Sequence, residues 1–363
     1  MEPEAKKSPV RFYEIDFLRF LAAILVVIYH YTFIGYNLSH LSPVRYEYLE
    51  PVTKYFYLGV ELFFVISGYV VLMSAYNKTL KQFFISRVIR LYPAFWVACT
   101  LTFIVVLMFG PSRQSLAWSE NMHLTNVQYI VNMTMLQGFL GYNDIDEAYW
   151  TLTTEISFYF LISLLLSYGL FKHLGVFLAL WLLYTAATHL TVAVKTPFHY
   201  LFIPKYSAFF IAGMLFYLLQ NSIMPLKKVY SLLFLTFLLC LRSAWVEAKV
   251  HTQVFHQYYS ATIVLLVVAA IFMVFWLIIK RKINMQRFSW LGWLGSITYP
   301  LYLLHSNIGY IILQRTGAYL NKYVLLVIII GFMLLMAYLL NFFVERKISN
   351  NLGKQLDKLL SSL

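Results

Sequence analysis

Three ionisable side chains lie in the first long apolar segment of the sequence. Arg19 and His30 are eleven residues apart, which is about three turns of an α-helix, and Asp16 lies three residues before Arg19. The three side chains therefore share one helical face, on which Asp16 and Arg19 can pair. An ionisable group costs about 2.5–3.5 kcal/mol at the centre of a membrane helix, so each of the three is a candidate for function.

Two carboxylates are expected at the depth of the histidine. Glu61 and Glu155 lie about five residues inside the outer ends of their predicted spans, and His30 lies about six residues below the outer end of its own. At a rise of 1.5 Å per residue, all three reach a level roughly 8 Å below the outer surface. A carboxylate orients an imidazole and raises its basicity, so this pattern predicts general base catalysis by His30, assisted by Glu155 or Glu61.

The arginines are expected on the other side of the membrane. Arg87 and Arg90 are three residues apart in the basic segment 78–91, which predicts an amphipathic interfacial helix that ends before Pro93. Arg19 lies near the same inner level. Arginine binds phosphates through paired hydrogen bonds, so these side chains predict an anion-binding inner side.

The elements that must hold these residues are membrane helices. The chain has 363 residues, 61% hydrophobic and 19% aromatic, which excludes a soluble globular domain. We predict one all-α membrane domain over 15–343 with about ten transmembrane helices, near 15–36, 56–76, 92–110, 151–171, 174–194, 198–220, 229–247, 258–279, 290–314 and 323–343. The first segment lacks a cleavage site and is expected to remain as a span.

Basic residues alternate between the predicted loops. Most of the 28 Lys and Arg residues fall in every second loop, so residues 1–14 and the tail 345–363 are both expected in the cytoplasm. The outer segment 111–150 is expected to contain an interfacial helix over 127–140, followed by Asp144, Asp146 and Glu147. The net charge of +13 follows this topology and does not indicate nucleic acid. Cys99 and Cys240 predict neither a disulfide nor a metal site.

Several motifs resemble those of the acyltransferase-3 family of membrane O-acyltransferases. The spacing of Arg19 and His30 matches the family's first-helix pattern, and Arg87, Arg90 and Pro93 match its Arg-x-x-Arg-x-x-Pro element. Residues 59–69, with Glu61 and Ser67, resemble the Gly-Val-Asp/Glu-Leu-Phe-Phe-Val-x-Ser-Gly element. Residues 150–155 resemble Trp-Ser-Leu-x-x-Glu, with Thr151 in place of Ser, and residues 296–305 resemble Ser-Tyr-x-x-Tyr-x-x-His.

The resemblance implies transfer of an acyl group, usually acetyl, from cytoplasmic acyl-CoA to a carbohydrate hydroxyl at the outer face of the bacterial inner membrane. Acetyl-CoA would be a donor substrate, with no permanently bound cofactor. Supporting or acceptor-binding roles are expected for Asp16, Ser67, Trp150, Tyr299 and His305. No appended soluble domain is expected, so the membrane domain acts alone, as an oligomer, or with a glycan-assembly partner.

Other interpretations fit some of these residues. His30 can be a packed, hydrogen-bonded side chain, Glu61 can cap its span, and the arginines can hold anionic lipid. Buried Glu and His also serve proton-coupled transporters or exporters, which is the alternative function. A structural scaffold would leave the common depth of three titratable groups unexplained. An acyl-histidine intermediate is a further alternative to general base catalysis.

Overall fold

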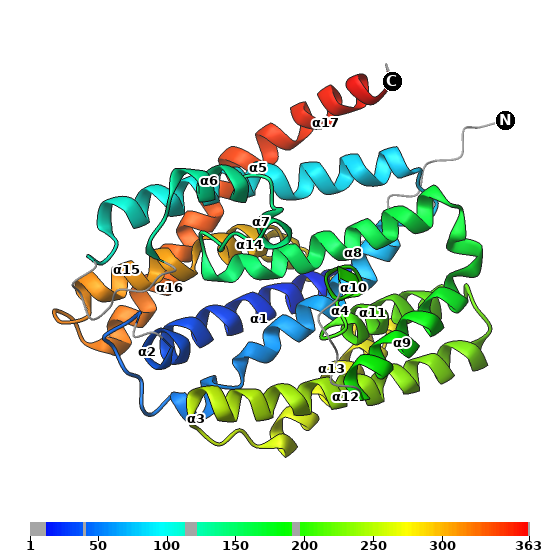
Figure 1. Cartoon of the computed structure of the whole chain (residues 1–363), viewed down its shortest axis with the longest axis horizontal. Coiled ribbons are helices and arrows are strands. Elements are labelled where there is room, and N and C mark those ends of the chain that lie inside the picture. Colours follow the sequence, from blue (N-terminus) through cyan, green and yellow to red (C-terminus); the bar gives the residue numbers. More distant parts are fainter. Residues whose placement is uncertain (1–11, 39–40, 113–121, 191–196, 362–363) are drawn as a thin grey trace.

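The protein is a bundle of helices, described here from a computed structural model that covers residues 12–38, 41–112, 122–190 and 197–361. These residues contain no strand. They include nine helices that are long and apolar enough to cross a membrane, which confirms the predicted all-α membrane fold. In Figure 1, α1 runs through the middle of the bundle, with α5 and α17 along one edge and α12 along the opposite edge.

The helices follow the predicted order of spans. The first four spans are α1 (Tyr13–Tyr29) with η1 (His30–Ile34) and α2 (Gly35–Asn37), α3 (Glu50–Thr53) with η2 (Phe56–Leu58) and α4 (Gly59–Ala75), α5 (Leu80–Phe109), and η4 (Glu147–Tyr149) with α8 (Trp150–Ser167). Then come η5 (Leu170–His173) with α9 (Leu174–Leu190), α10 (Pro197–Phe202) with α11 (Ser207–Gln220), α12 (Leu226–Phe255), α13 (Ala261–Ile279), α14 (Leu291–Leu304) with α15 (Ser306–Thr316), and α16 (Lys322–Leu340) with η6 (Asn341–Glu345) and α17 (Arg346–Ser361). The end of the predicted span 174–194 and most of residues 1–14 lie outside the described residues.

The central helix α1 packs mainly against α14 and α4. The approach to α14 is close, because a Cβ atom on Gly295 would lie 2.3 Å from the Asp16 carboxylate. The crossing of α4 and α11 is closer still, since a Cβ atom on Gly68 would lie 2.0 Å from the carbonyl oxygen of Phe210. Glycine at position 68 lets the backbones of α4 and α11 meet, and glycine at position 295 leaves room for the side chain of Asp16 against α14.

The predicted span 290–314 is two helices that meet at His305. In a continuous helix the N–H of Asn307 would bond to Leu303 O, but it donates instead to Asp146 Oδ2 at 2.9 Å. Leu303 O accepts from the hydroxyl of Tyr149 at 3.1 Å. Side chains from the segment before α8 therefore replace one bond of the helix and interrupt it.

The helix boundary predicted before Pro93 is wrong. Residues 80–109 form one helix, which begins with a capping box between Thr79 and Gln82 and contains Pro93 in its interior. Proline has no N–H and leaves the carbonyl four residues earlier without its usual partner. That carbonyl, Ile89 O, accepts from Ser349 Oγ at 3.0 Å, so tertiary contact allows the helix to continue.

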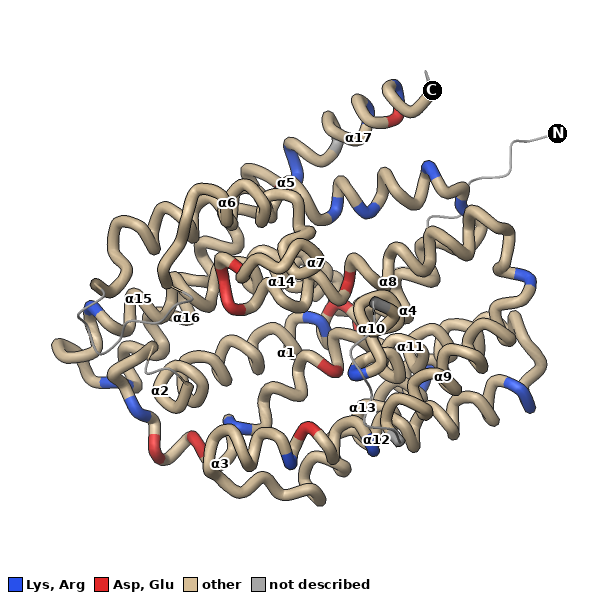
Figure 2. The backbone as a smooth tube through the Cα atoms, viewed as in Figure 1, with Lys and Arg blue, Asp and Glu red and all other residues tan. Residues whose placement is uncertain are grey.

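The predicted helix over 127–140 is also interrupted. The segment forms two short helices, α6 (Asn126–Asn132) and α7 (Gln137–Leu140), and the side chains of Asn132, Gln137 and Asp146 are buried. Figure 2 shows most Lys and Arg near helix ends and loops, with a few acidic and basic segments in the interior beside α1, α8 and α14. Some charges are thus held inside the bundle.

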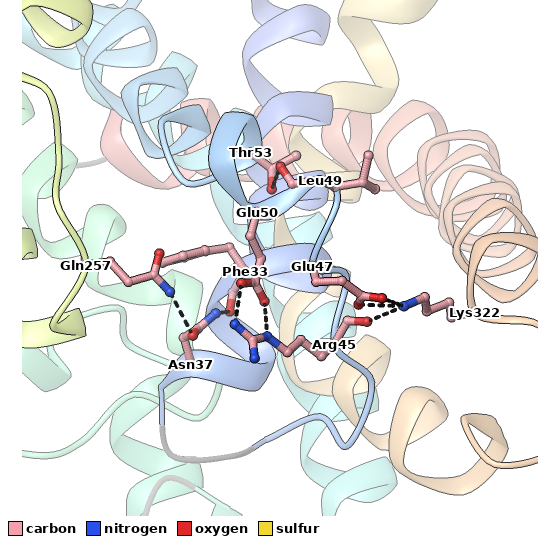
Figure 3. A network of polar contacts seen from close by, with 9 residues as sticks. All are labelled: Phe33, Asn37, Arg45, Glu47, Leu49, Glu50, Thr53, Gln257 and Lys322. Atoms are coloured by element: carbon pink, nitrogen blue, oxygen red, sulfur yellow. Dashed lines mark hydrogen bonds and ion pairs between the residues drawn. The ribbon is translucent and has the colours of Figure 1, made fainter.

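A polar network closes the end of the bundle at which α1 finishes (Figure 3). Arg45 pairs with Glu50 at 3.2 Å, and Lys322 on α16 donates to Glu47. Asn37, at the end of α2, accepts from Gln257 at 3.3 Å. These contacts tie the end of α2 to Gln257, just after α12, and the loop before α3 to the start of α16.

Candidate active site

A cavity of about 280 Å³ lies between α1, α4, α5, α8 and α14. Three cations line it, Arg19, Arg87 and Arg90, and so do Glu155 and Ser67. The remaining wall is aromatic or aliphatic and includes Tyr159, Tyr299 and Tyr302. We call this the arginine cavity. It brings together six of the predicted site residues, from five helices that are distant in the sequence.

The carboxylate of Glu155 is anchored inside the arginine cavity. Ser67 Oγ donates to Glu155 Oε1 at 3.0 Å, so α4 and α8 are joined through these side chains. Ser67, for which a supporting or acceptor-binding role was expected, holds the carboxylate through its hydroxyl. Close packing is provided by its neighbour Gly68.

The arginines are fixed by local contacts. Arg19 Nη1 lies 3.9 Å from Asp16 Oδ1, which confirms the predicted pair. The guanidinium of Arg87 lies 5.6 Å from the ring centroids of both Phe83 and Tyr159, and that of Arg90 lies 5.7 Å from the ring of Tyr299. Aromatic faces hold the guanidinium groups of Arg87 and Arg90 without adding charge, whereas Arg19 is partly balanced by Asp16, so the cavity offers three fixed guanidinium groups to an anionic ligand.

Two histidines form a pair further along α1. His305 Nε2 lies 3.3 Å from His30 Nδ1, and the ring centroids are 4.8 Å apart. His30 Nδ1 also lies 2.8 Å from Val26 O, and His305 Nδ1 lies 2.8 Å from Tyr302 O. We call His30 and His305 the histidine pair. The chain thus brings together two residues that are 275 positions apart.

The carbonyl contacts assign the tautomers of the pair. A carbonyl oxygen only accepts, so both Nδ1 atoms carry hydrogen when the rings are neutral. The Nδ1–H of His30 then lies between Val26 O and the unprotonated Nε2 of His305. This leaves His30 Nε2 with its lone pair, which is the form that a general base or a nucleophile needs.

An apolar layer separates the arginine cavity from the histidine pair. Val26, Ala148 and Tyr302 pack together as a buried cluster, with Val60 and Phe63 against it. Val60, Phe63 and Tyr302 also line the cavity, whereas His30 does not. Tyr302 connects the two regions, because its carbonyl accepts from His305 and its hydroxyl contacts Thr151 at 2.8 Å.

The expected grouping of His30, Glu61 and Glu155 at one depth is wrong. Glu155 is bonded to Ser67, which lies six residues beyond Glu61 on α4 and therefore about 9 Å further along the helix. Glu61 lines neither the cavity nor the histidine pair, and its electrostatic neighbours are Glu247 and Lys205. Counting from span ends misjudges the depth because the spans begin at different levels, some with an extra turn such as η2 or η4.

The supporting residues are divided between the two regions. Tyr299 lines the arginine cavity and donates to Leu91 O at 3.2 Å. Trp150 lies outside the cavity lining, where its ring packs against Tyr206 at 5.4 Å. His305, which the sequence placed among the supporting residues, is the direct neighbour of His30.

Some residues of the site were not predicted. Tyr159 lies one helical turn after Glu155, and its ring contacts Arg87. Residues four positions apart share a helical face, so the spacing from Glu155 could have predicted that Tyr159 belongs to the site. Tyr302 is also one helical turn before His305. Asp146 and Tyr149 lacked such a signal, because their partners on α14 and α15 are distant in sequence.

Asp146 lies between secondary-structure elements and is buried. Its carboxylate accepts from the N–H groups of Ala148 and Asn307, yet burial raises its pKa to about 7. Burial likewise raises the pKa of Asp144 to about 6, although Gln137 donates to it at 2.8 Å. Both groups lie in the segment that interrupts the helix at His305, next to the histidine pair.

The chain belongs to the acyltransferase-3 family, since the model of that family's acyltransferase domain matches residues 12–343. It is therefore a multi-pass membrane protein of an acyltransferase class, as the helices and the resemblance in the sequence indicated. No solved structure matches the chain.

Three curated proteins illustrate its similarity. Nodulation protein 10 of Rhizobium leguminosarum bv. viciae is 28% identical over 178 residues, which are 46% of this chain and 47% of that protein. Protein ORF330 of Acidianus two-tailed virus is 24% identical, over 69% of this chain and 72% of its own. Peptidoglycan O-acetyltransferase OatA of Listeria monocytogenes is 29% identical over 40% of this chain and 22% of its own. The chain thus spans about half of the first of these relatives and about a fifth of the last.

Proposed function

We propose that the protein is a membrane O-acyltransferase that moves an acetyl group from cytoplasmic acetyl-CoA to a hydroxyl of a lipid-linked or cell-surface carbohydrate. The observation that carries this proposal is the arginine cavity, in which three cations surround one anchored carboxylate. The similarity to OatA, a peptidoglycan O-acetyltransferase, supports the choice of acetyl and of a carbohydrate acceptor.

The donor fits the arginine cavity by charge. Coenzyme A carries several phosphate groups, and Arg19, Arg87 and Arg90 offer guanidinium groups from two helices. The helices that contain these arginines have basic residues at the ends predicted to be cytoplasmic. The donor therefore enters from the cytoplasm of a bacterial cell. With the phosphates at the arginines, the thioester extends into the apolar part of the cavity toward Tyr302.

The histidine pair supplies the acid–base chemistry in this proposal. His30 Nε2 takes the proton of the acceptor hydroxyl, and the hydroxyl oxygen attacks the thioester carbonyl. A new C–O bond forms, the C–S bond breaks, and the coenzyme A thiolate takes the proton back from His30. His305 Nε2 and Val26 O hold the Nδ1–H of His30, which stabilises the transient imidazolium.

The apolar layer must open for this transfer. Tyr302 and Phe63 lie between the cavity and the pair, so a rotation of these side chains joins the two regions. Such a barrier also keeps water from the thioester while the acceptor is absent. An acyl group carried by His30 Nε2 is the alternative course, and it needs the same opening.

The test is transfer by the purified protein in detergent with labelled acetyl-CoA and a glycan extract from the membranes of the source cells. We expect label to move to the glycan without any sealed compartment or ion gradient, because an enzyme needs neither. The proton-coupled transporter considered above needs both. Absence of transfer in detergent, together with uptake or release that depends on a gradient in vesicles, would reject the proposal.

A further inference from the structure

A carboxylate of the C-terminal segment lies beside the arginine cavity. Glu345 ends the π-helical turn η6 and is buried, with 8% of its surface exposed. Its Oε1 lies 3.6 Å from Arg90 Nη1. Residues 345–363 are expected in the cytoplasm, and the structure packs α17 of this segment against α5.

Asn341 holds the carboxylate in place. Its Nδ2 donates to Glu345 Oε2 and also to Ser296 O, the latter at 3.2 Å. In this π-helical turn the N–H of Arg346 donates to Asn341 O, five residues back. An α-helix would bond four residues back, so the turn contains one extra residue. Single π-helical turns are frequent at functional sites, because they redirect the side chains that they contain.

The C-terminal segment is anchored to both walls that hold Arg90. Pro93 frees the carbonyl of Ile89, which accepts from Ser349, and Pro300 frees the carbonyl of Ser296, which accepts from Asn341. Arg90 is on the first of these helices, and Tyr299, whose ring lies 5.7 Å from its guanidinium, is on the second. The segment is therefore hydrogen-bonded to both α5 and α14.

Arg90, which lines the arginine cavity, keeps one unpaired hydrogen-bond donor. Its Nη2 is buried and has no hydrogen-bond partner among the described residues, although Nη1 faces Glu345. Burying an unpaired charged donor is costly, so the Arg90 side chain gains when this donor meets an anion. Glu345 and Tyr299 together fix the plane of the guanidinium and thus the direction of that donor.

We propose that Glu345, held by Asn341, is a positioning residue that orients Arg90 toward a phosphate group of the acyl-CoA donor. This inference rests on the proposed donor. It makes the C-terminal segment part of the donor site, although none of its described residues lines the arginine cavity.

The experiment is a titration of the purified full chain with acetyl-CoA, comparing Glu345→Gln with Asp357→Asn. Asp357 is the matched control, because it pairs with Lys81 at 2.9 Å and joins the same two helices at an exposed place. We expect Glu345→Gln to weaken binding about 10- to 100-fold, the range for hydrogen bonds of charged groups, and Asp357→Asn to leave it within about twofold. Glu345→Asp, which keeps the charge, should recover part of the affinity.

A double variant separates orientation from a general structural effect. In an Arg90→Ala background, Glu345→Gln should cause no further loss of affinity, since its target is gone. Equal affinity of Glu345→Gln and the unsubstituted protein would overturn the inference, as would equal losses in the Arg90 and Arg90→Ala backgrounds. If Glu345→Gln does not fold, Glu345→Asp and Asn341→Ala provide the same comparison. An unsubstituted protein that does not bind acetyl-CoA would instead overturn the proposed function.

Discussion

The histidine pair is the central feature at the scale of residues. His30 was predicted from its position in an apolar helix, and the structure adds a partner that controls its tautomer. His305 Nε2 and Val26 O both face His30 Nδ1, so the reactive lone pair is assigned to Nε2. The predicted partners, Glu61 and Glu155, lie elsewhere, because sequence gives the depth of a residue only to within several positions.

Replacing His305 should reduce transfer without removing the base. We expect His305→Ala to lower the rate of acetyl transfer about 10²-fold, because His30 loses the neighbour that holds its Nδ1–H. His189→Ala is the control, since His189 contacts Pro204 O in another part of the bundle and should retain the rate. A rate for His305→Ala equal to that of the unsubstituted protein would show that the pair has no role in orientation.

The buried aspartates before α8 predict a pH-dependent stability. Their pKa values are raised to about 6 for Asp144 and about 7 for Asp146, against about 3.9 in an unfolded chain. Between these limits the folded protein binds more protons than the unfolded one, so stability should fall as pH rises from about 4 to about 7. Thermal unfolding in detergent measures this.

The variant Asp144→Asn/Asp146→Asn isolates these two groups. It should be less stable overall, because an amide at position 146 has one accepting oxygen, whereas the carboxylate of Asp146 accepts from the N–H groups of both Ala148 and Asn307. It should also lose much of the fall in unfolding temperature between pH 4 and pH 7. A pH dependence identical to that of the unsubstituted protein would assign the effect to other groups.

At the scale of elements, the helices were predictable and their interruptions were not. The lengths of the apolar segments predicted the order of spans, since apolar length is a local property of the chain. The break at His305 depends on Asp146 and Tyr149, and the continuity of α5 through Pro93 depends on Ser349. These contacts join residues that are distant in sequence, so no local pattern contained them.

The crossing of α4 and α11 gives a test of packing. We expect Gly68→Ala to destabilise the protein by about 1–3 kcal/mol, because its Cβ would overlap Phe210 O at 2.0 Å. Gly331→Ala on α16 is the control, since a Cβ there has no neighbour within 4 Å and alanine favours the helix. Thermal unfolding in detergent compares the two. Equal unfolding temperatures would mean that the crossing relaxes without cost.

At the scale of the whole molecule, the bundle separates cations from the acid–base groups. The arginine cavity and the histidine pair lie at different levels along α1, with the apolar layer between them. The sequence predicted this separation through Arg19 and His30 on one helical face. It did not predict that Glu155 belongs with the arginines, because that depends on the contact of α8 with α4.

The arginine cavity predicts that removing a single cation lowers the affinity for acetyl-CoA. Arg87→Ala and Arg19→Ala should each weaken acetyl-CoA binding about 10- to 100-fold in a titration, and the loss should shrink at high salt. Arg315→Ala is the control, because Arg315 is exposed and donates to Phe109 O at 3.0 Å outside the cavity. Unchanged affinity in both cavity variants would place the donor elsewhere.

The most direct measurement compares His30→Ala with the unsubstituted protein for both acetyl-CoA binding and acetyl transfer to glycan. If the cavity binds the donor and the histidine pair performs the chemistry, affinity should stay within about twofold while transfer falls about 10²- to 10⁴-fold, the usual contribution of a general base. Normal transfer by a folded His30→Ala protein would contradict the proposed division of roles.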